Sequence, residues 1–121
     1  MKIQIITEKI DRKVLVKLAN AWFETFVKFV VDINTGHMAV GGELHSDGEF
    51  LLLENGADQS NLWGGNFFPY KPSDQRIEFT SLINIRPRDN NVSMEIEDDN
   101  IREKVTTFVE FLLMNPDDNL A

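Results

Sequence analysis

The chain has 121 residues, and its formal net charge of −8 at pH 7 excludes the basic surface that nucleic acid or an anionic membrane requires. Because it has no cysteine and no apolar run near the roughly 20 residues that span a bilayer, disulfides, thiolate catalysis and a membrane-spanning helix are also excluded. With 42% hydrophobic residues, we expect one domain over residues 1–121, cytoplasmic, and either monomeric or a small oligomer such as a homodimer.

The first part of the chain predicts a strand, a helix and a β-hairpin. Residues 2–6 alternate partly, as a short strand does. Asp11 is placed to cap a helix, and apolar residues recur after it at helical spacing. These apolar residues are Val14, Leu15, Leu18, Ala19, Trp22 and Phe23. β-Branched and aromatic residues then fill positions 26–33, a tight turn is indicated at 34–36, and positions 37–44 form the returning arm.

A capping-box pattern predicts the next helix. Residues 46–49 place a serine at the N-cap and a glutamate three positions later, ahead of the apolar run Phe50-Leu51-Leu52-Leu53. Gly56 then ends the segment as a C-cap glycine does. We expect a short buried helix of about two turns, in which capping accounts for both Ser46 and Glu49.

The second part predicts further strands. Residues 62–68 form a strand interrupted by Gly64-Gly65, which indicates a bulge or a close approach of another backbone. The strongest alternation covers residues 76–86, which we predict to be the longest strand, stopped by Pro87. Residues 92–96 predict one more short strand.

A last helix completes the predicted fold. Asp98, Asp99 or Asn100 caps it, and one stripe of it is apolar. The stripe consists of Ile101, Val105, Phe108, Val109, Leu112 and Leu113. The fold class is therefore α+β, with a mainly antiparallel sheet in a two-layer arrangement, the two longer helices on one face, and one short helix.

Polar residues near strand ends predict a binding site at the polar end of the sheet. If positions 37–44 form a strand, Glu43 and His45 point the same way, as one metal ion or a shared proton requires. Zinc needs three or four ligands, however, and a solvated outer face of the sheet is an alternative explanation. The candidate ligand-binding residues are Glu43, His45, Asn61, Trp63, Asn84 and Arg86.

For three of these residues, the sequence predicts a specific arrangement. We expect Glu43, His45 and Arg86 to share one cavity, because an arginine is the best partner for a carboxylate on a partly buried sheet. Because the unperturbed pKa of histidine is about 6.5, His45 would be the one group in that cavity that titrates near neutral pH. No catalytic set accompanies them: a Gly-x-Ser-x-Gly motif is absent, and Gly64-Gly65 lacks the lysine and helix of a phosphate loop.

Four segments of the sequence stand out: Val-Gly-Gly-Glu-Leu-His-Ser-Asp (40–47), Leu-Leu-Leu-Glu-Asn-Gly (51–56), Gln-Ser-Asn-Leu-Trp-Gly (59–64) and Ile-Asn-Ile-Arg-Pro (83–87). They resemble a family of short, mostly bacterial proteins known only as a domain of unknown function. The resemblance covers nearly the whole chain. It implies no activity, cofactor or partner.

The sequence thus favours a small non-enzymatic module that binds a protein partner or a small ligand at the polar end of its sheet, without a cofactor or a metal. One alternative is a metal-dependent or acid–base hydrolase that uses Glu43 and His45. Another is an antitoxin-like or structural interaction protein that pairs with itself or with a partner. Metal content and gel filtration distinguish these hypotheses.

Overall fold

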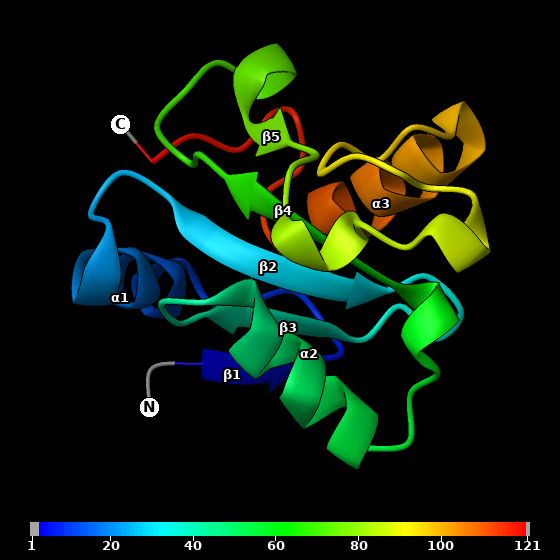
Figure 1. The fold of residues 1–121 in the computed structure, drawn as a ribbon. Coiled ribbons are helices and arrows are strands. Elements are labelled where there is room, and N and C mark those ends of the chain that lie inside the picture. The colour runs from blue at the N-terminus through cyan, green and yellow to red at the C-terminus, as the bar shows by residue number, and fades with distance from the viewer. Residues whose placement is uncertain (1–2, 121) are drawn as a thin grey trace.

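The computed structural model describes residues 3–120, and Figure 1 shows the arrangement of their elements. The helices are α1 (Arg12–Trp22), α2 (His45–Glu54) and α3 (Asp99–Leu112). The strands are β1 (Ile3–Ile6), β2 (Val27–Asp32), β3 (Met38–Gly41), β4 (Leu62–Phe67) and β5 (Ile77–Glu78). Short 3₁₀ turns are η1 (Gln59–Asn61), η2 (Ser73–Gln75), η3 (Leu82–Asn84) and η4 (Pro87–Asp89).

The strands form one antiparallel sheet in the order β1-β3-β2-β4-β5. The predicted hairpin is confirmed as β2 and β3. Its turn is held by the Asp32 carboxylate, which accepts hydrogen bonds from the backbone N–H groups of Asn34 (2.9 Å) and Thr35 (3.3 Å). Gly36 follows with φ 82°, a conformation that suits glycine. The α+β fold class is therefore confirmed.

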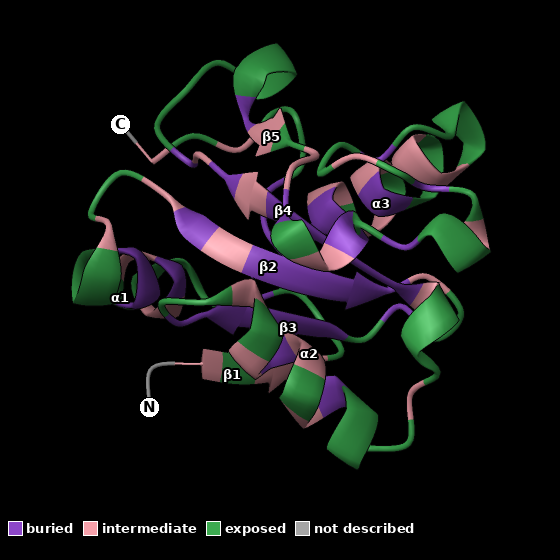
Figure 2. Ribbon diagram, viewed as in Figure 1, coloured by how far each residue is buried: buried purple, intermediate pink, exposed green. Residues whose placement is uncertain are grey.

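The two longer helices cover one face of the sheet, as predicted. Buried residues of α1 and α3 share one core cluster with strand residues, and Figure 2 shows the buried interior along the sheet. This cluster includes Leu15, Leu18, Phe29, Val31, Met38, Trp63, Phe67, Val105, Val109 and Leu112. The short helix α2 packs on the opposite face, where Leu52 joins Val30, Ala39 and Leu62. The sheet therefore has a helix-covered core on each side, which makes three layers rather than the predicted two.

Helices α1 and α3 begin where the sequence predicted. Asp11 accepts a hydrogen bond from the Lys13 N–H (2.8 Å), and Asp98 accepts from the N–H groups of Asn100 (2.8 Å) and Ile101 (3.1 Å). Both are N-caps. In the predicted stripe of α3, Phe108 is only partly buried, against the core.

The start of α2 differs from the prediction. Two consecutive glycines, Gly41 (φ 100°) and Gly42 (φ 85°), adopt left-handed conformations and end β3 early. The helix therefore starts at His45 with Leu44 as its N-cap, and no side chain caps it. The capping box was wrong: Ser46 lies inside the helix, and Glu49 accepts a long hydrogen bond from Gln59 (3.4 Å).

The glycine pair of β4 permits a close approach without a bulge. Residues 62–67 pair one to one with β2, so the predicted bulge was wrong. A Cβ atom on Gly65 would lie 2.5 Å from the Glu78 carbonyl oxygen, and one on Gly64 would lie 2.9 Å from Ser81. The alternative, a close backbone approach, is confirmed.

The predicted long strand over residues 76–86 was wrong beyond β5. Only Ile77 and Glu78 pair with β4. The chain then continues through η3 and η4, joined by isolated bridges between Thr80 and Glu95 and between Arg86 and Asn91. Residues 92–96 form no strand of their own. Their backbone groups bond partly to side chains and partly to the backbone of Phe79 and Ser81.

Candidate functional site

A hollow of about 300 Å³ lies between the start of α2, the start of β2, the end of β4, and η3. We call it the His45 hollow. Its walls include Lys28, Leu44, His45, Ser46, Leu82 and Met94. The hollow lies on the α2 face of the sheet, and the glycine turn after β3 positions His45 over it.

His45 is held in place by the sheet beneath it. Its Nε2 atom lies 2.7 Å from the Gly65 carbonyl oxygen. Because a carbonyl oxygen only accepts hydrogen bonds, Nε2 carries the proton, and Nδ1 of the neutral ring is an acceptor. The ring orientation is therefore fixed from below.

The His45 ring is neutral at pH 7. Burial lowers its pKa from the ordinary 6.5 to about 4, and the charge of Lys28 adds to this lowering. The Gly65 carbonyl and the neighbouring Asn66 side chain act in the opposite direction. The expectation that His45 titrates near neutral pH is contradicted.

The polar floor of the hollow comes from paired strands. Lys28 of β2 and Asn66 of β4 are direct cross-strand partners, so their side chains lie on the same face of the sheet. The Asn66 amide donates to Glu78 (3.1 Å). Lys28 thus brings a positive charge next to a neutral imidazole.

The rim of the hollow is apolar and exposed. Leu44, Leu82 and Met94 expose 53%, 71% and 41% of their surface. They come from three separate segments and line the same cavity. Large exposed hydrophobic residues gathered around one cavity are typical of a binding site.

A second polar cluster surrounds Trp63 of β4. Trp63 is 2% exposed, and the Arg86 guanidinium carbon lies 4.3 Å from the centre of its ring. Arg86 donates to Asp89 (2.9 Å) and to the Ile83 carbonyl (3.0 Å). Asn84, fully buried, bonds to Gly64 of the neighbouring strand.

The structure thus divides the six predicted site residues. It brings together Trp63, Asn84 and Arg86, but their side chains are buried and directed into the fold. Glu43 is exposed in the loop before α2, and Asn61 ends η1, at the opposite end of β4 from the hollow. Of the six predicted residues, only His45 lines the hollow.

The expected cavity shared by Glu43, His45 and Arg86 was wrong. Arg86 pairs with Asp89 rather than with Glu43. His45 is a helical residue, so strand alternation no longer places it beside Glu43. The reason is the glycine turn, which ends the strand before either residue. Among residues 3–120, no group of three or more histidines and carboxylates could hold a metal ion.

Sequence reasoning missed Lys28, Leu44, Leu82 and Met94. Lys28 carried one usable signal, because it is the lone charge within the apolar run of residues 27–31. The three hydrophobic residues carried none, since apolar residues are expected to enter the core. The exposure of Leu82 and Met94 depends on the irregular path of residues 79–96, whereas Leu44 lies at the start of α2.

The fold and the hollow define a class of small α+β protein built on one antiparallel sheet with helices on both faces. The chain belongs to the family described as protein of unknown function (DUF5674), which matches residues 4–112. No curated protein and no solved structure matches the chain. Within the described residues, no helix has the length and apolar character needed to cross a membrane.

Proposed function

We propose that this protein is a non-enzymatic binding module and that the His45 hollow takes a small ligand with an apolar body and an anionic head. The observation that carries the proposal is the convergence of three exposed hydrophobic residues, Leu44, Leu82 and Met94, on one cavity that also contains a lysine. The apolar rim suits the body of such a ligand.

The polar groups of the hollow suit the head. The Lys28 ammonium forms no ion pair with any carboxylate of residues 3–120. The Ser46 hydroxyl provides a further hydrogen-bond donor for a carboxylate. A carboxylate on the ligand therefore meets a cation that lies 5.2 Å from the centre of the Phe23 ring but is not paired with a carboxylate of the described residues.

The state of His45 supports recognition rather than acid–base catalysis. A general base works best with a pKa near the operating pH, and burial lowers that of His45 to about 4. Its Nε2–H is also committed to Gly65. The ring serves as a fixed wall of the site that offers one acceptor.

Two probes with the same apolar tail test the proposal: hexanoate and hexanol, titrated while the backbone amide NMR signals of His45, Ser46 and Leu82 are followed. We expect hexanoate to shift these signals at lower concentration than hexanol. Lys28→Met should remove that difference while leaving hexanol binding in place, because only the carboxylate interacts with the ammonium.

A matched pair of variants localises the binding. Leu82→Asn should weaken both probes several-fold, on the order of the 1 kcal/mol that one lost apolar contact contributes. Val92→Asn is the control, because Val92 is similarly exposed (68% against 71%) but does not line the hollow. Equal effects of the two variants, or signal shifts remote from the hollow, would contradict the proposal.

A further inference from the structure

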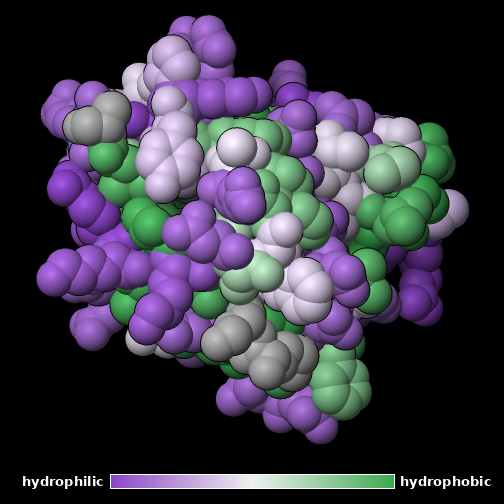
Figure 3. Space-filling model, turned by 90° about the vertical axis from the view of Figure 1, so that its left-hand side faces the viewer, coloured by the Kyte–Doolittle hydropathy of each residue, from purple (hydrophilic) through white to green (hydrophobic). Residues whose placement is uncertain are grey.

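Three phenylalanine rings form a stacked cluster at the end of the sheet next to α1. The ring centres of Phe23 and Phe26 are 4.5 Å apart with an interplanar angle of 12°, and those of Phe26 and Phe68 are 4.9 Å apart. Phe23 follows α1, Phe26 precedes β2, and Phe68 follows β4. None of the three is fully buried. Figure 3 looks onto this side of the molecule, where hydrophobic residues gather among hydrophilic ones.

A strained turn brings the first two rings together. Glu24 has φ 64°, a left-handed conformation that is uncommon for a residue other than glycine. The Thr25 N–H bonds to the Phe23 carbonyl (2.7 Å), two residues back, which reverses the chain within one residue. Strain of this kind is retained mainly where the surrounding structure or a function requires it.

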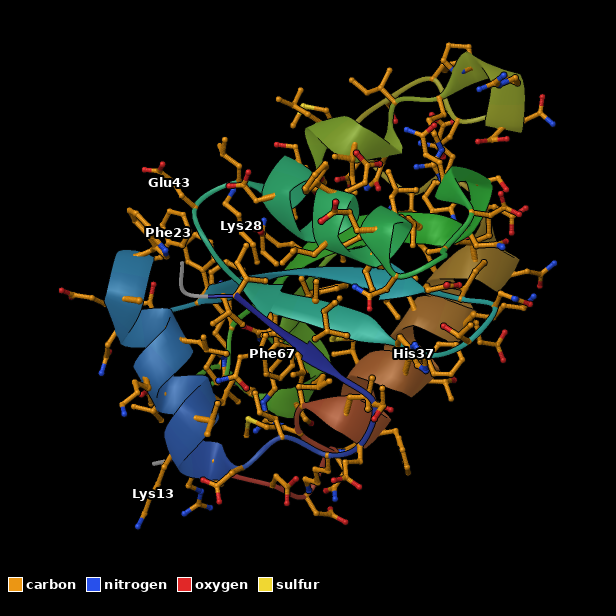
Figure 4. The ribbon with its side chains drawn as sticks, turned by 90° about the horizontal axis from the view of Figure 1, so that it is seen from below. Lys13, Phe23, Lys28, His37, Glu43 and Phe67 are labelled. Carbon is orange, nitrogen blue, oxygen red and sulfur yellow. The ribbon has the colours of Figure 1, made fainter. Side chains whose placement is uncertain are left out.

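Two lysines lie on the rings of this cluster. The Lys28 ammonium lies 5.2 Å from the centre of the Phe23 ring, and the Lys71 ammonium lies 4.2 Å from that of Phe68. Figure 4 shows Phe23 and Lys28 at one corner of the molecule, far from His37. We call the surface formed by Phe23, Phe26, Phe68, Lys28 and Lys71 the aromatic face.

The lysines of the aromatic face are not paired with carboxylates of the described residues, although Figure 4 shows Glu43 at the same corner of the molecule. Within residues 3–120, neither lysine forms an ion pair, although the chain has 20 acidic and 12 basic residues. An ammonium group on a ring face still has N–H donors directed away from the ring. The face therefore combines apolar rings with two cations that lack carboxylate partners.

We propose that the aromatic face docks an acidic segment of a partner protein, with carboxylates on Lys28 and Lys71 and apolar side chains on the phenylalanine rings. Charge complementarity selects this occupant. A second copy of this chain is disfavoured because each copy has a net charge of −8. Trp22 and Tyr70, which are next to residues of the face in the sequence, are 47% and 50% exposed.

The test uses two fluorescein-labelled octapeptides whose binding is followed by anisotropy. The first repeats Asp and Glu around one Phe and one Leu, and the second replaces each acid with its amide. We expect the acidic peptide to bind at least about tenfold more tightly than its amide counterpart, and to lose that advantage as salt is raised.

Variants separate this surface from the His45 hollow. Lys71 does not line the hollow, so Lys71→Glu should weaken the acidic peptide about tenfold or more, while hexanoate binding stays unchanged. Lys104→Glu, an exposed lysine of α3, is the control of equal charge change and should leave both unchanged. Lys71 is exposed, so the variant is expected to fold.

Several results would overturn the proposal. These are an undetectable interaction with the acidic peptide, equal binding of the amide peptide, or equal effects of Lys71→Glu and Lys104→Glu. Tighter binding of single-stranded oligothymidine than of the acidic peptide would also overturn it, because stacked rings with lysines are used for single-stranded nucleic acid as well. Failure of hexanoate to bind would affect only the His45 hollow.

Discussion

The backbone hydrogen-bonding groups on the two edges of β4 are paired in different ways. Along its inner edge, six consecutive residues pair with β2 in regular antiparallel register. Along its outer edge, β5 pairs with only two residues, and the side-chain amide of Asn84 then takes the place of a strand. Its Oδ1 accepts from the Gly64 N–H (2.9 Å) and its Nδ2 donates to the Gly64 carbonyl (3.0 Å). One side chain thus reproduces the pairing of a backbone peptide group.

A second asparagine organises the segment on that outer edge. The Asn91 amide nitrogen donates to the carbonyl groups of Asn84 (2.8 Å), Ser93 (3.0 Å) and Glu95 (2.8 Å), and its oxygen accepts from the Glu97 N–H (2.9 Å). The contrast teaches that a buried backbone needs partners rather than a particular secondary structure. Over residues 79–97, these two amides meet that need together with backbone hydrogen bonds such as those from Ser81 to Met94 (3.0 Å) and from Ile96 to Phe79 (2.9 Å).

We expect the largest loss of stability from a substitution of Asn84, which pairs with the outer edge of β4. Asn84→Leu removes hydrogen bonds to Gly64 and Met94 and leaves buried backbone groups without partners. We expect the free energy of unfolding to fall by about 4 kcal/mol, a large share of typical domain stability. Urea unfolding measures it. Asn20→Ala, an exposed asparagine of α1, is the control, and a similar loss in both variants would refute the role of the amide.

The next effect tests how closely the outer segment approaches β4. Gly65→Ala places a methyl group against the Glu78 carbonyl and the Phe29 ring, and we expect it to cost about 2–3 kcal/mol. Gly56→Ala meets no atom within 4 Å and suffers only the strain of φ 96°, about 1 kcal/mol. Thermal unfolding of both variants gives the comparison, and equal losses would show that steric crowding is unimportant.

A third effect concerns the imidazole above Gly65. Because burial lowers the pKa of His45 from 6.5 to about 4, the unfolded chain binds more protons than the folded chain between these values. The free energy of unfolding should therefore fall as the pH drops through this window, by an amount on the order of 2 kcal/mol from this residue.

His45→Gln isolates that contribution. The variant should lose less stability than the wild type between pH 7 and pH 4.5, since glutamine does not titrate. His37→Gln, which changes an exposed histidine, should behave as the wild type does. Parallel pH profiles for His45→Gln and the wild type would count against the buried neutral ring.

The smallest effect distinguishes a true cap from an apparent one. Ser46→Ala should change stability by no more than about 0.5 kcal/mol, as expected for a surface position, because Ser46 does not cap α2. Asp98→Ala should cost about 1 kcal/mol, because Asp98 accepts two hydrogen bonds at the start of α3. A loss of about 1 kcal/mol for Ser46→Ala would restore the capping box.

Much of the fold could be predicted from local patterns. The hairpin, α1 and α3 follow from apolar periodicity, a turn and two capping aspartates, all of which act between near neighbours in the sequence. The alternation of Ile77, Phe79, Ser81, Ile83 and Ile85 misled because it reports only which side chains are apolar. It does not report that Asn84 and Asn91 supply the hydrogen bonds that a strand would otherwise make.

The candidate site could be predicted only in part. His45 was identified, but its partners were assigned from a strand that Gly41 and Gly42 end early. The signal was present in these two adjacent glycines, which favour a sharp change of direction. The exposed rim residues Leu82 and Met94 could not be foreseen, because their position depends on long-range bonds to β4.

The substitution of a side chain for a strand at the outer edge of β4 also bears on solubility. A strand with unpaired backbone groups is a template on which another chain can add, and proteins commonly cover such edges. Here Asn84 occupies the hydrogen-bonding groups of Gly64, and the segment that follows covers the edge with turns that cannot themselves continue a sheet. The same amide that stabilises the fold therefore closes this edge of β4 to foreign strands, and its loss would favour aggregation as well as unfolding.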